Sequence, residues 1–378
     1  MRVVPASRLP GLFVFGLMCL PGIVFSQNRG GAELKLNTGK EIFQAACAAC
    51  HGPDGKGRPQ TTLGFEPPPT FPDFTVCNAT TREPDVDWRA IIHNGGPARG
   101  FSEIMPSFTE ALTVPQIEKV IQYVRGFCRN TSWPRGDLNL PRALATEKAF
   151  PEDEAVIQTA INARGAPGLA NNLLYERRFG IKNQFELNVP FSFQRQDTRT
   201  WFGGVGDLTL GYKRMLASSL RTGSIFSVSG EVILPTGNKD RGFGSGVTIF
   251  EGFAAYGQLL PKNSFLQFQS GFEAPTHSED VAKAVYWRTV LGKNLNQGMG
   301  LGRLWAPMIE VLADRELATG ASINWDVLPQ FQVTLSSRQH IRANIGVRVP
   351  VNNTASRPVQ VIFYLLWDWF DGGLRDGW

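Results

Sequence analysis

From about Leu173 onward, apolar and polar residues alternate one by one along runs of roughly ten residues. Successive side chains of a strand point to opposite faces, so each run predicts a strand with one apolar and one polar face. Turn-forming residues separate the runs, as at 235–238, 261–263 and 352–353. The apolar positions of four such runs are Phe185, Leu187, Val189, Phe191 and Phe193; Phe226, Val228, Val232 and Leu234; Leu266, Phe268 and Phe272; and Ile341, Ala343, Ile345, Val347 and Val349.

Two architectures could cover these apolar faces: a soluble sandwich of two sheets, or a barrel whose apolar face meets lipid. The strands are long for a sandwich, and their polar faces carry charged and amide groups suited to a water-filled interior. We therefore predict an antiparallel transmembrane β-barrel of about ten to twelve strands over residues 171–370, with a soluble periplasmic β-domain as the alternative. Aromatic residues near strand ends, as in interfacial girdles, are Phe191, Phe193, Tyr212, Trp287, Trp305, Trp325, Trp367 and Trp369.

The last predicted strand, Val359–Phe370, ends in an aromatic residue, which resembles the C-terminal signal of outer-membrane barrels. Residues 371–378 follow it as a tail. Either Phe370 or Trp378 would then be the recognised end.

The first half of the chain has a helical pattern instead. Thr38 is the expected N-cap of a helix over 39–49, and 87–93 and 115–127 predict two more helices. The last of these places its apolar residues on one face. Loops rich in proline and glycine separate the helices, so we predict an all-α domain over residues 33–130.

Residues 131–170 are rich in proline and charge, and predict a linker between the two parts. A short helix from Glu152 to Ala163 is the one regular element expected there.

The strongest chemical signal is Cys47-Ala48-Ala49-Cys50-His51, the attachment pattern of c-type haem. Each thiol can add to one vinyl group of haem, and the short spacer holds both thiols along one edge of the porphyrin. The adjacent imidazole then lies under the ring and binds the iron. We predict one covalently bound haem c, with Cys47 and Cys50 as thioether sites and His51 as the proximal ligand.

Met105, within Ile104-Met105-Pro106-Ser107-Phe108, is the expected distal ligand, since a thioether suits haem iron and Pro106 stiffens the loop. His93 is the alternative. The predicted metal ligands are thus His51 and Met105, and we predict no catalytic residues.

These residues resemble a class I monohaem cytochrome c: a haem motif after a first helix, a Met-Pro-x-Phe loop and a closing helix over 116–125. The joined architecture resembles fused cytochrome–porins. The stretch Gly206–Lys213, followed by Leu234–Gly237, resembles the barrel family of the MetA phenol-degradation pathway, and that resemblance covers roughly 170–370.

The chain begins with Arg2 and Arg8 and an apolar run from Leu12 to Phe25, which predicts a signal peptide over residues 1–26, cut after Ser26. An uncleaved anchor, or a lipoprotein signal using Cys19, is the alternative. Export leaves Cys77 and Cys128 as a pair outside the cytosol, where disulfides persist, and two buried free thiols are the alternative.

The composition and charge of the chain limit the classes of function that it can have. The net charge of +5 comes without a Lys/Arg run or a nucleic-acid motif, so no nucleic-acid partner is expected. No catalytic constellation is visible, and His277 and His340 stand alone. We expect an electron-transfer protein rather than a catalyst.

The predicted function is that of an outer-membrane c-type cytochrome, which transfers single electrons through a haem tethered to a β-barrel pore. Its partners would be outer-membrane lipid and a redox donor or acceptor, either a periplasmic cytochrome or an extracellular, diffusible donor. The alternatives are a small-molecule channel with an accessory cytochrome domain, and a soluble periplasmic cytochrome with a β-rich domain. A haem domain of this size is too bulky for the lumen, so we expect it beside the barrel mouth, in the periplasm.

Overall fold

The computed structural model describes residues 36–57, 68, 71–164, 166–195, 200–295 and 304–368 of the chain. The expected signal peptide, residues 1–26, and the expected tail, residues 371–378, lie outside the described residues, as do Trp369 and Phe370. Among the helices of the described part, none combines the length and the apolar character needed to span a bilayer. The described residues all belong to one compact unit that begins at Leu36.

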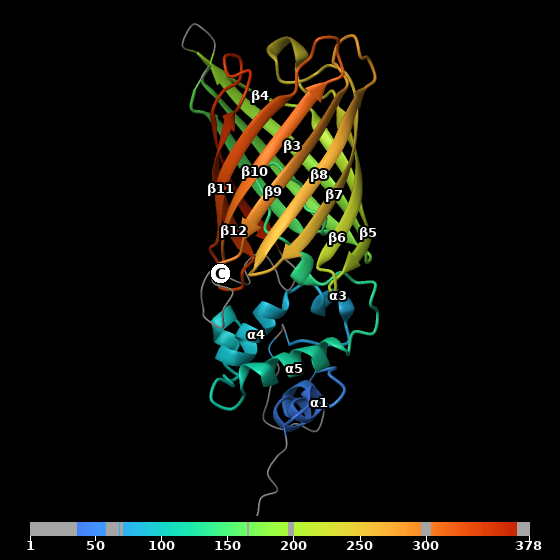
Figure 1. Cartoon of the computed structure of the whole chain (residues 1–378), viewed down its shortest axis with the longest axis vertical. Helices are drawn as coiled ribbons and strands as arrows, with labels where there is room; N and C mark the ends of the chain where they lie inside the picture. Colours follow the sequence, from blue (N-terminus) through green and yellow to red (C-terminus); the bar gives the residue numbers. More distant parts are fainter. Residues whose placement is uncertain are drawn as a thin grey trace, which may run out of the picture. The chain divides into compact units, whose positions relative to one another are not determined.

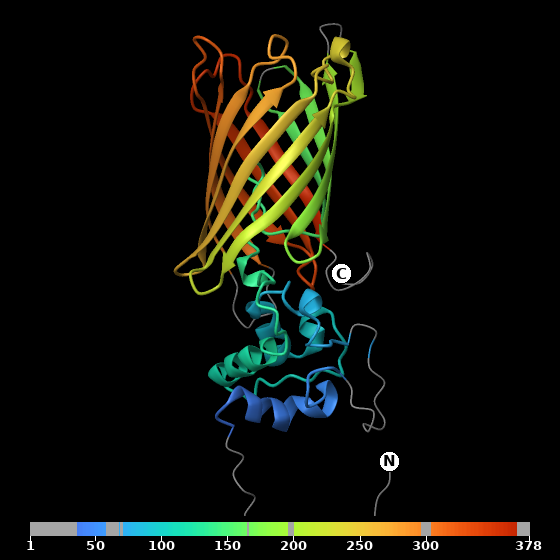
Figure 2. The same ribbon diagram turned by 90° about the vertical axis from the view of Figure 1, so that its right-hand side faces the viewer.

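The second part of the chain is an antiparallel sheet that closes on itself, as Figures 1 and 2 show. Closure comes from the pairing of β1 with β13, the first strand with the last. The strands are β1 Glu154–Asn162, β2 Gly168–Phe179, β3 Asn183–Arg195, β4 Trp201–Val205, β5 Leu208–Ser219, β6 Ser224–Leu234, β7 Ile249–Leu260, β8 Ser264–Pro275, β9 Ala284–Lys293, β10 Trp305–Glu316, β11 Asn324–Thr334, β12 Ile341–Pro350 and β13 Gln360–Asp368.

Strands β4 and β5 act as one interrupted strand, because both pair with β3. β5 pairs with residues 183–188 of β3, and β4 pairs with residues 191–195. The break lies opposite Pro190, which has no N–H to give to the ladder; its carbonyl accepts from Gly206 N at 2.7 Å. The closed barrel therefore has twelve strands, the upper end of the predicted range.

The barrel begins earlier than the sequence indicated. The stretch expected as a helix from Glu152 to Ala163 is a strand, β1, and it lies inside the range 131–170 expected as a linker. Its residues alternate between the two faces of the sheet, with Val156 buried and Ile157 exposed. The stretch is a strand because both of its edges find partners, β2 on one side and β13 on the other.

The two faces of the barrel differ as the alternation predicted. The outer face carries exposed large apolar side chains, and the inner face carries buried polar ones. This arrangement rules out the alternative of a soluble sandwich, because the apolar face is turned outward. Exposed on the outside are Leu173, Phe185, Leu210, Phe250, Phe268, Phe272, Leu291, Ile309, Ile345 and Leu365; buried on the inside are Glu176, Gln184, Lys213, Ser227, Gln267, Gln269, Glu310, Gln330, Gln332 and Asn344.

The two ends of the barrel differ in the length of their connections. At the end where β1 begins, three connections are the short turns 180–182, 220–223 and 261–263, and the other two are 335–340 and the longer 294–304. Longer loops, such as 235–248, join strands at the other end. Outer-membrane barrels have short periplasmic turns and long extracellular loops.

The first part of the chain is helical, as predicted. Its elements are α1 Gly39–Ile42, a π-helical turn Phe43–Cys47, α2 Ala48–His51, α3 Cys77–Thr80, α4 Asp85–Asn94, a 3₁₀ turn Gly96–Arg99 and α5 Val114–Arg125. Thr38 caps α1, and Glu41 returns the bond to its backbone, which makes a capping box. The predicted apolar face of α5 is buried: Ile117, Val120, Ile121 and Val124.

One core and one cross-link hold these helices together. The core packs Ile42 and Phe43 of the first helical segment against Phe74 and the buried face of α5. Cys77 and Cys128 form a disulfide with their Cα atoms 5.0 Å apart, so the pairing expected from their number is confirmed.

Contacts of several kinds join the helical part to the barrel end where β1 begins. Arg82, which follows α3, makes an ion pair with Asp153, and both side chains are nearly inaccessible to water. Arg338, in the turn between β11 and β12, lies over the Phe101 ring at 4.5 Å and donates to the Gly100 carbonyl at 3.1 Å. The helical part therefore lies at the end of the barrel with the short turns.

Candidate haem site and barrel lumen

The three residues of the haem motif lie on consecutive helical turns. Cys47 ends the π-helical turn, and Cys50 and His51 lie in α2. The helix stops at Gly52, whose φ of 75° favours glycine. The turn after it is fixed by the bond from Gly57 N to the His51 carbonyl (3.0 Å), so His51 is held between a helix and a tight turn.

The half-buried imidazole of His51 lies among aromatic rings. It stacks on Phe71 with ring centroids 4.9 Å apart and an angle of 6° between the planes, and it also contacts Phe74. Burial lowers the pKa of His51 to about 4, so the ring is neutral near pH 7 and has a lone pair for a metal. Its Nδ1 is buried without a hydrogen-bond partner among the described residues.

The two thiols of the motif are free and half-buried. Burial, and then the neighbouring Cys50, raise the pKa of Cys47 to about 11, which keeps that thiol protonated. Cys47 and Ala48 also pack against the apolar core of the helical part. Two free thiols and a neutral imidazole beside an apolar core are the groups that a c-type haem requires, so the residues fit this cofactor.

Met105 lies in the loop after α4, which is tied back to the end of that helix. Gly96 N donates to the Met105 carbonyl at 3.0 Å, and Phe108 N donates to the Ile92 carbonyl at 3.1 Å. Phe108 packs against the same core as Cys47. The Met105 side chain is half-buried.

His93, the alternative distal ligand, is already engaged. Both ring nitrogens lie within hydrogen-bond distance of Thr109 Oγ1, at 2.8 Å for Nδ1 and 3.0 Å for Nε2. Asn94 Oδ1 is also 2.8 Å from Nδ1. These contacts favour Met105 as the residue left to bind iron.

The barrel lumen contains a segment of the chain that we call the plug, residues 138–153. The plug lies within the range expected as a linker, yet its side chains are largely buried. One buried carboxylate of the barrel wall, Glu310, anchors its backbone by accepting from the N–H groups of Leu144, Ala145 and Thr146 at 2.9–3.1 Å. Three further hydrogen bonds anchor the plug to the wall. Gln267 donates to the Pro141 carbonyl and the Tyr364 hydroxyl donates to the Arg142 carbonyl. Gln184 Oε1 accepts from Glu152 N.

Charges also join the plug to the wall. Arg142 is 6% exposed and pairs with Glu154 of β1 at 2.7 Å and Glu176 of β2 at 2.9 Å. It also pairs with Glu147 inside the plug at 3.0 Å. Lys148 pairs with Glu152 and, at 3.3 Å, with Glu154. The plug therefore adds cations to buried wall carboxylates, of which Glu176 also has Lys213 of the wall at 3.7 Å and the Gln184 amide at 2.8 Å.

Apolar side chains of the plug fill the remaining space. Leu144 packs with Val156, Leu328, Leu366 and other wall residues, while Phe150 packs with Met215 and Ile225. Leu140 and Ala143 pack with Phe265, Val290 and Met308. The plug is part of the folded core.

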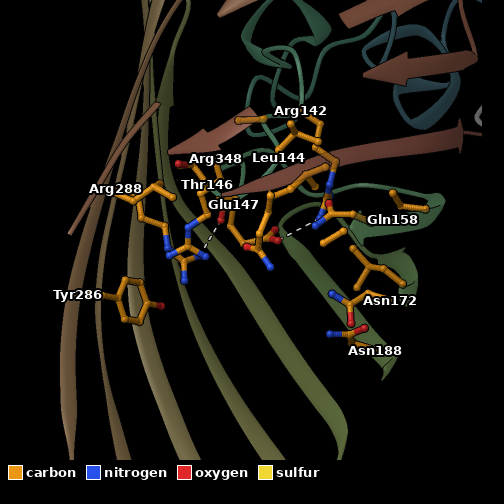
Figure 3. A pocket seen from close by; sticks show the side chains of 18 of the residues that line it. Arg142, Leu144, Thr146, Glu147, Gln158, Asn172, Asn188, Tyr286, Arg288 and Arg348 are labelled. Atoms are coloured by element: carbon orange, nitrogen blue, oxygen red, sulfur yellow. Dashed lines mark hydrogen bonds and ion pairs between the residues drawn. The ribbon is translucent and has the colours of Figure 1, made fainter. Parts of the chain in front are cut away.

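Above the plug, the lumen leaves a cavity of about 440 Å³. Figure 3 shows Asn172 and Asn188 on one wall of the cavity and Tyr286 and Arg288 on the other. Glu147 and Thr146 of the plug form part of its lining. Arg288 donates to the Ala145 carbonyl at 2.6 Å, so this wall cation is turned toward the plug.

The sequence reasoning missed the plug and its partners. Its signal was present, because 138–153 alternates buried apolar residues with Arg142, Lys148 and Glu152 and does not show the even polarity of a linker. The inward-facing glutamates of the strands were a second signal. Their need for cations becomes evident only when the strand register is known.

Comparisons with known proteins bear on both parts. Residues 35–124 match the family described as cytochrome C oxidase, cbb3-type, subunit III. No curated protein matches the chain. A solved outer membrane channel of the COG4313 group from Pseudomonas putida F1 is 13% identical, covers 61% of this chain and 100% of its own, and has a TM-score of 0.42. LpxR from Salmonella typhimurium is 6% identical, covers 57% of this chain and 100% of its own, and has a TM-score of 0.39.

These structural likenesses are too weak to add to the argument, so the barrel rests on its own strand pairing. The family match implies a c-type haem in the first part. The chain thus joins a cytochrome domain to a closed twelve-stranded barrel of the outer-membrane type.

Replacing Arg142 should destabilise the barrel. Arg142→Ala leaves Glu154 and Glu176 buried without this cation, and losing one partner of a buried pair costs about 3–5 kcal/mol. We expect the variant to unfold at a lower midpoint concentration of guanidinium chloride. Heat-modifiable migration on gels is the measurement that reports unfolding. Arg164→Ala removes an exposed arginine just after β1 and should leave the midpoint unchanged. Equal midpoints for both variants would contradict the assigned role of the plug.

Proposed function

We propose that the protein is an outer-membrane c-type cytochrome that transfers single electrons through one covalently bound haem. Cys47 and Cys50 hold the haem by thioether bonds, His51 is the proximal ligand and Met105 the distal one. When bound, the haem supplies a one-electron iron couple. The chain's own residues hold the ligands, exclude water and fix the site at one end of the barrel.

The observation that carries this proposal is the state of the four cysteines after residue 35. Cys77 and Cys128 are joined, which leaves Cys47 and Cys50, three positions apart, as the free thiols of the described residues. Two thiols at this spacing, with a histidine directly after the second, can each form a thioether with one vinyl group of haem. The half-buried, neutral His51 beside them supports haem as the group that these thiols hold.

The haem domain lies on the periplasmic side in this proposal. The support is the asymmetry of the connections, since the helical part contacts the end of the barrel with the short turns. A periplasmic haem would exchange electrons with a partner such as a soluble cytochrome.

The plug favours electron relay over an open channel. It occupies the lumen next to the haem domain, and its backbone is bonded to several different strands. A small-molecule channel with an accessory cytochrome remains the second candidate, because the cavity of about 440 Å³ lies above the plug. For that function the plug would have to move.

Haem attachment is tested by changing both thiols. Cys47→Ser with Cys50→Ser should abolish haem staining of the denatured protein band, because no covalent bond then holds the cofactor. Cys77→Ser with Cys128→Ser, which removes the disulfide, is the matched control and should keep the stain. Persistent staining in the first variant would exclude covalent attachment through this motif.

The distal ligand has its own spectroscopic test. A methionine–iron bond in the oxidised protein gives a weak far-red charge-transfer band, and we expect this band to be lost in Met105→Ala. Met308→Leu changes a methionine of the barrel wall and should keep the band. Absence of the band in the unchanged protein, or its survival in Met105→Ala, would assign the distal position to another residue.

The route of the electrons is tested in liposomes that contain the protein with its haem domain inside. We expect that an external donor unable to cross the barrel leaves the haem oxidised, because the plug blocks access and the hydrocarbon core is about 30 Å thick. Reduced cytochrome enclosed in the liposomes should reduce the haem. Rapid reduction by the external donor would favour a route across the membrane.

A further inference from the structure

Acidic residues on successive strands form a row along the inner wall of the barrel, because the strand register places them opposite one another. Each member stands directly opposite the next on the neighbouring strand, and Gly211 interrupts the row once. The row begins where β13 ends and β1 begins, at the plugged end, and rises toward the long loops. Its members are Asp368, Glu154, Glu176, Glu186, Glu231, Glu251 and Glu273.

The lower members of the row have cationic partners. Arg342 of the wall lies 3.2 Å from Asp368, and His340 also bonds that carboxylate. Glu154 and Glu176 share Arg142 of the plug. This half of the row is neutralised within the protein.

The upper members lack such partners. Glu231 and Glu273 make no ion pair or hydrogen bond with any described residue, and Glu251 accepts only from the Tyr286 hydroxyl. Opposed residues on adjacent antiparallel strands have Cβ atoms about 5 Å apart, so like charges there repel.

Two wall cations offset part of this charge. Lys213 attracts Glu186 and Glu231, although its ammonium pairs with Glu147 at 3.5 Å and with Glu176 at 3.7 Å. Arg288 attracts Glu251 and Glu273, although its guanidinium is bonded to the Ala145 carbonyl.

Glu186 lies where a ligand in the lumen could reach it. Its side chain is 7% exposed, lines the cavity above the plug and pairs with no described residue. Asn188, two residues along the same strand, lines the same cavity with a buried Oδ1 that has no partner. The Glu186 carboxylate and the Asn188 amide oxygen therefore line the cavity without a hydrogen-bond donor among the described residues.

The glycine in the row keeps Glu186 and Glu231 close. A Cβ atom at Gly211 would lie 3.1 Å from Glu186 Cβ and 3.2 Å from Glu231 Cγ. The two side chains therefore converge over the position where a larger residue would separate them. Glu186 and Glu231 approach each other across Gly211.

We propose that Glu186, Glu231, Glu251 and Glu273 form a binding path for hydrated divalent cations, leading from the outer mouth of the barrel to the plug. The donors are all oxygens, which suits hard divalent cations. A doubly charged ion shared by two neighbouring carboxylates relieves their repulsion better than a single charge does. This site is separate from the haem and does not depend on the proposed electron transfer.

Titration of the detergent-solubilised full-length protein with Mn²⁺ tests the path, because bound Mn²⁺ loses the sharp electron paramagnetic resonance signal of the free ion. The unchanged protein should bind Mn²⁺, and Glu231→Gln with Glu251→Gln should weaken binding at least about tenfold. Glu273→Gln alone, at a half-exposed position, should weaken it less and guards against misfolding of the double variant. Heat-modifiable migration should show that each barrel is folded.

The matched control removes two acidic groups from the exposed loop after β8. Glu279→Gln with Asp280→Asn should bind Mn²⁺ like the unchanged protein. Haem staining should be the same in every variant, so failure of this proposal and failure of haem binding are distinguishable. No Mn²⁺ binding by the unchanged protein, as expected if the carboxylates are simply protonated, or equal weakening in the control, overturns the proposal.

Discussion

Closure of the sheet is the constraint from which the other features of this barrel follow. In a bilayer, each backbone N–H and C=O group needs a partner within the protein, so the first and last strands must pair. The pairing of β1 with β13 meets this need and also fixes the register all round the barrel. Once the register is fixed, Asp368, Glu154 and Glu176 necessarily stand side by side on the inner wall. Closure thus creates a concentration of buried negative charge.

The plug neutralises part of that charge, and it also links the two parts of the chain. Arg142 and Lys148 neutralise wall carboxylates, while Glu310 of the wall binds three consecutive N–H groups of the plug. The same segment continues into the helical part, where Gly136 N donates to the Thr81 carbonyl at 2.6 Å. The haem domain is therefore joined to the barrel through a buried, charge-matched segment. A flexible tether would give no such fixed position.

The sequence predicted much of this architecture because its signals are local. Alternation identified the strands, the spacing of Cys47, Cys50 and His51 identified the haem motif, and the face of α5 was read from its period. The first strand was missed because its residues 154–162 follow a proline- and charge-rich stretch and its strand character depends on partners more than a hundred residues away, such as Leu366 opposite Val156. The plug was missed for the same reason, since Arg142 looks like a solvated charge until the wall carboxylates are placed around it.

The arrangement also limits how electrons can move. In the proposed function, a haem beside the short turns would lie on one side of a hydrocarbon core about 30 Å thick, and the plug fills the lumen between the helical part and the cavity. The plug contacts the wall through ionic, amide, hydroxyl and backbone groups and through apolar side chains. In the proposed function, the barrel serves to hold the haem at the membrane. On that proposal a redox partner reaches the haem from the end of the barrel with the short turns, while the other half of the lumen is free to serve a separate ligand.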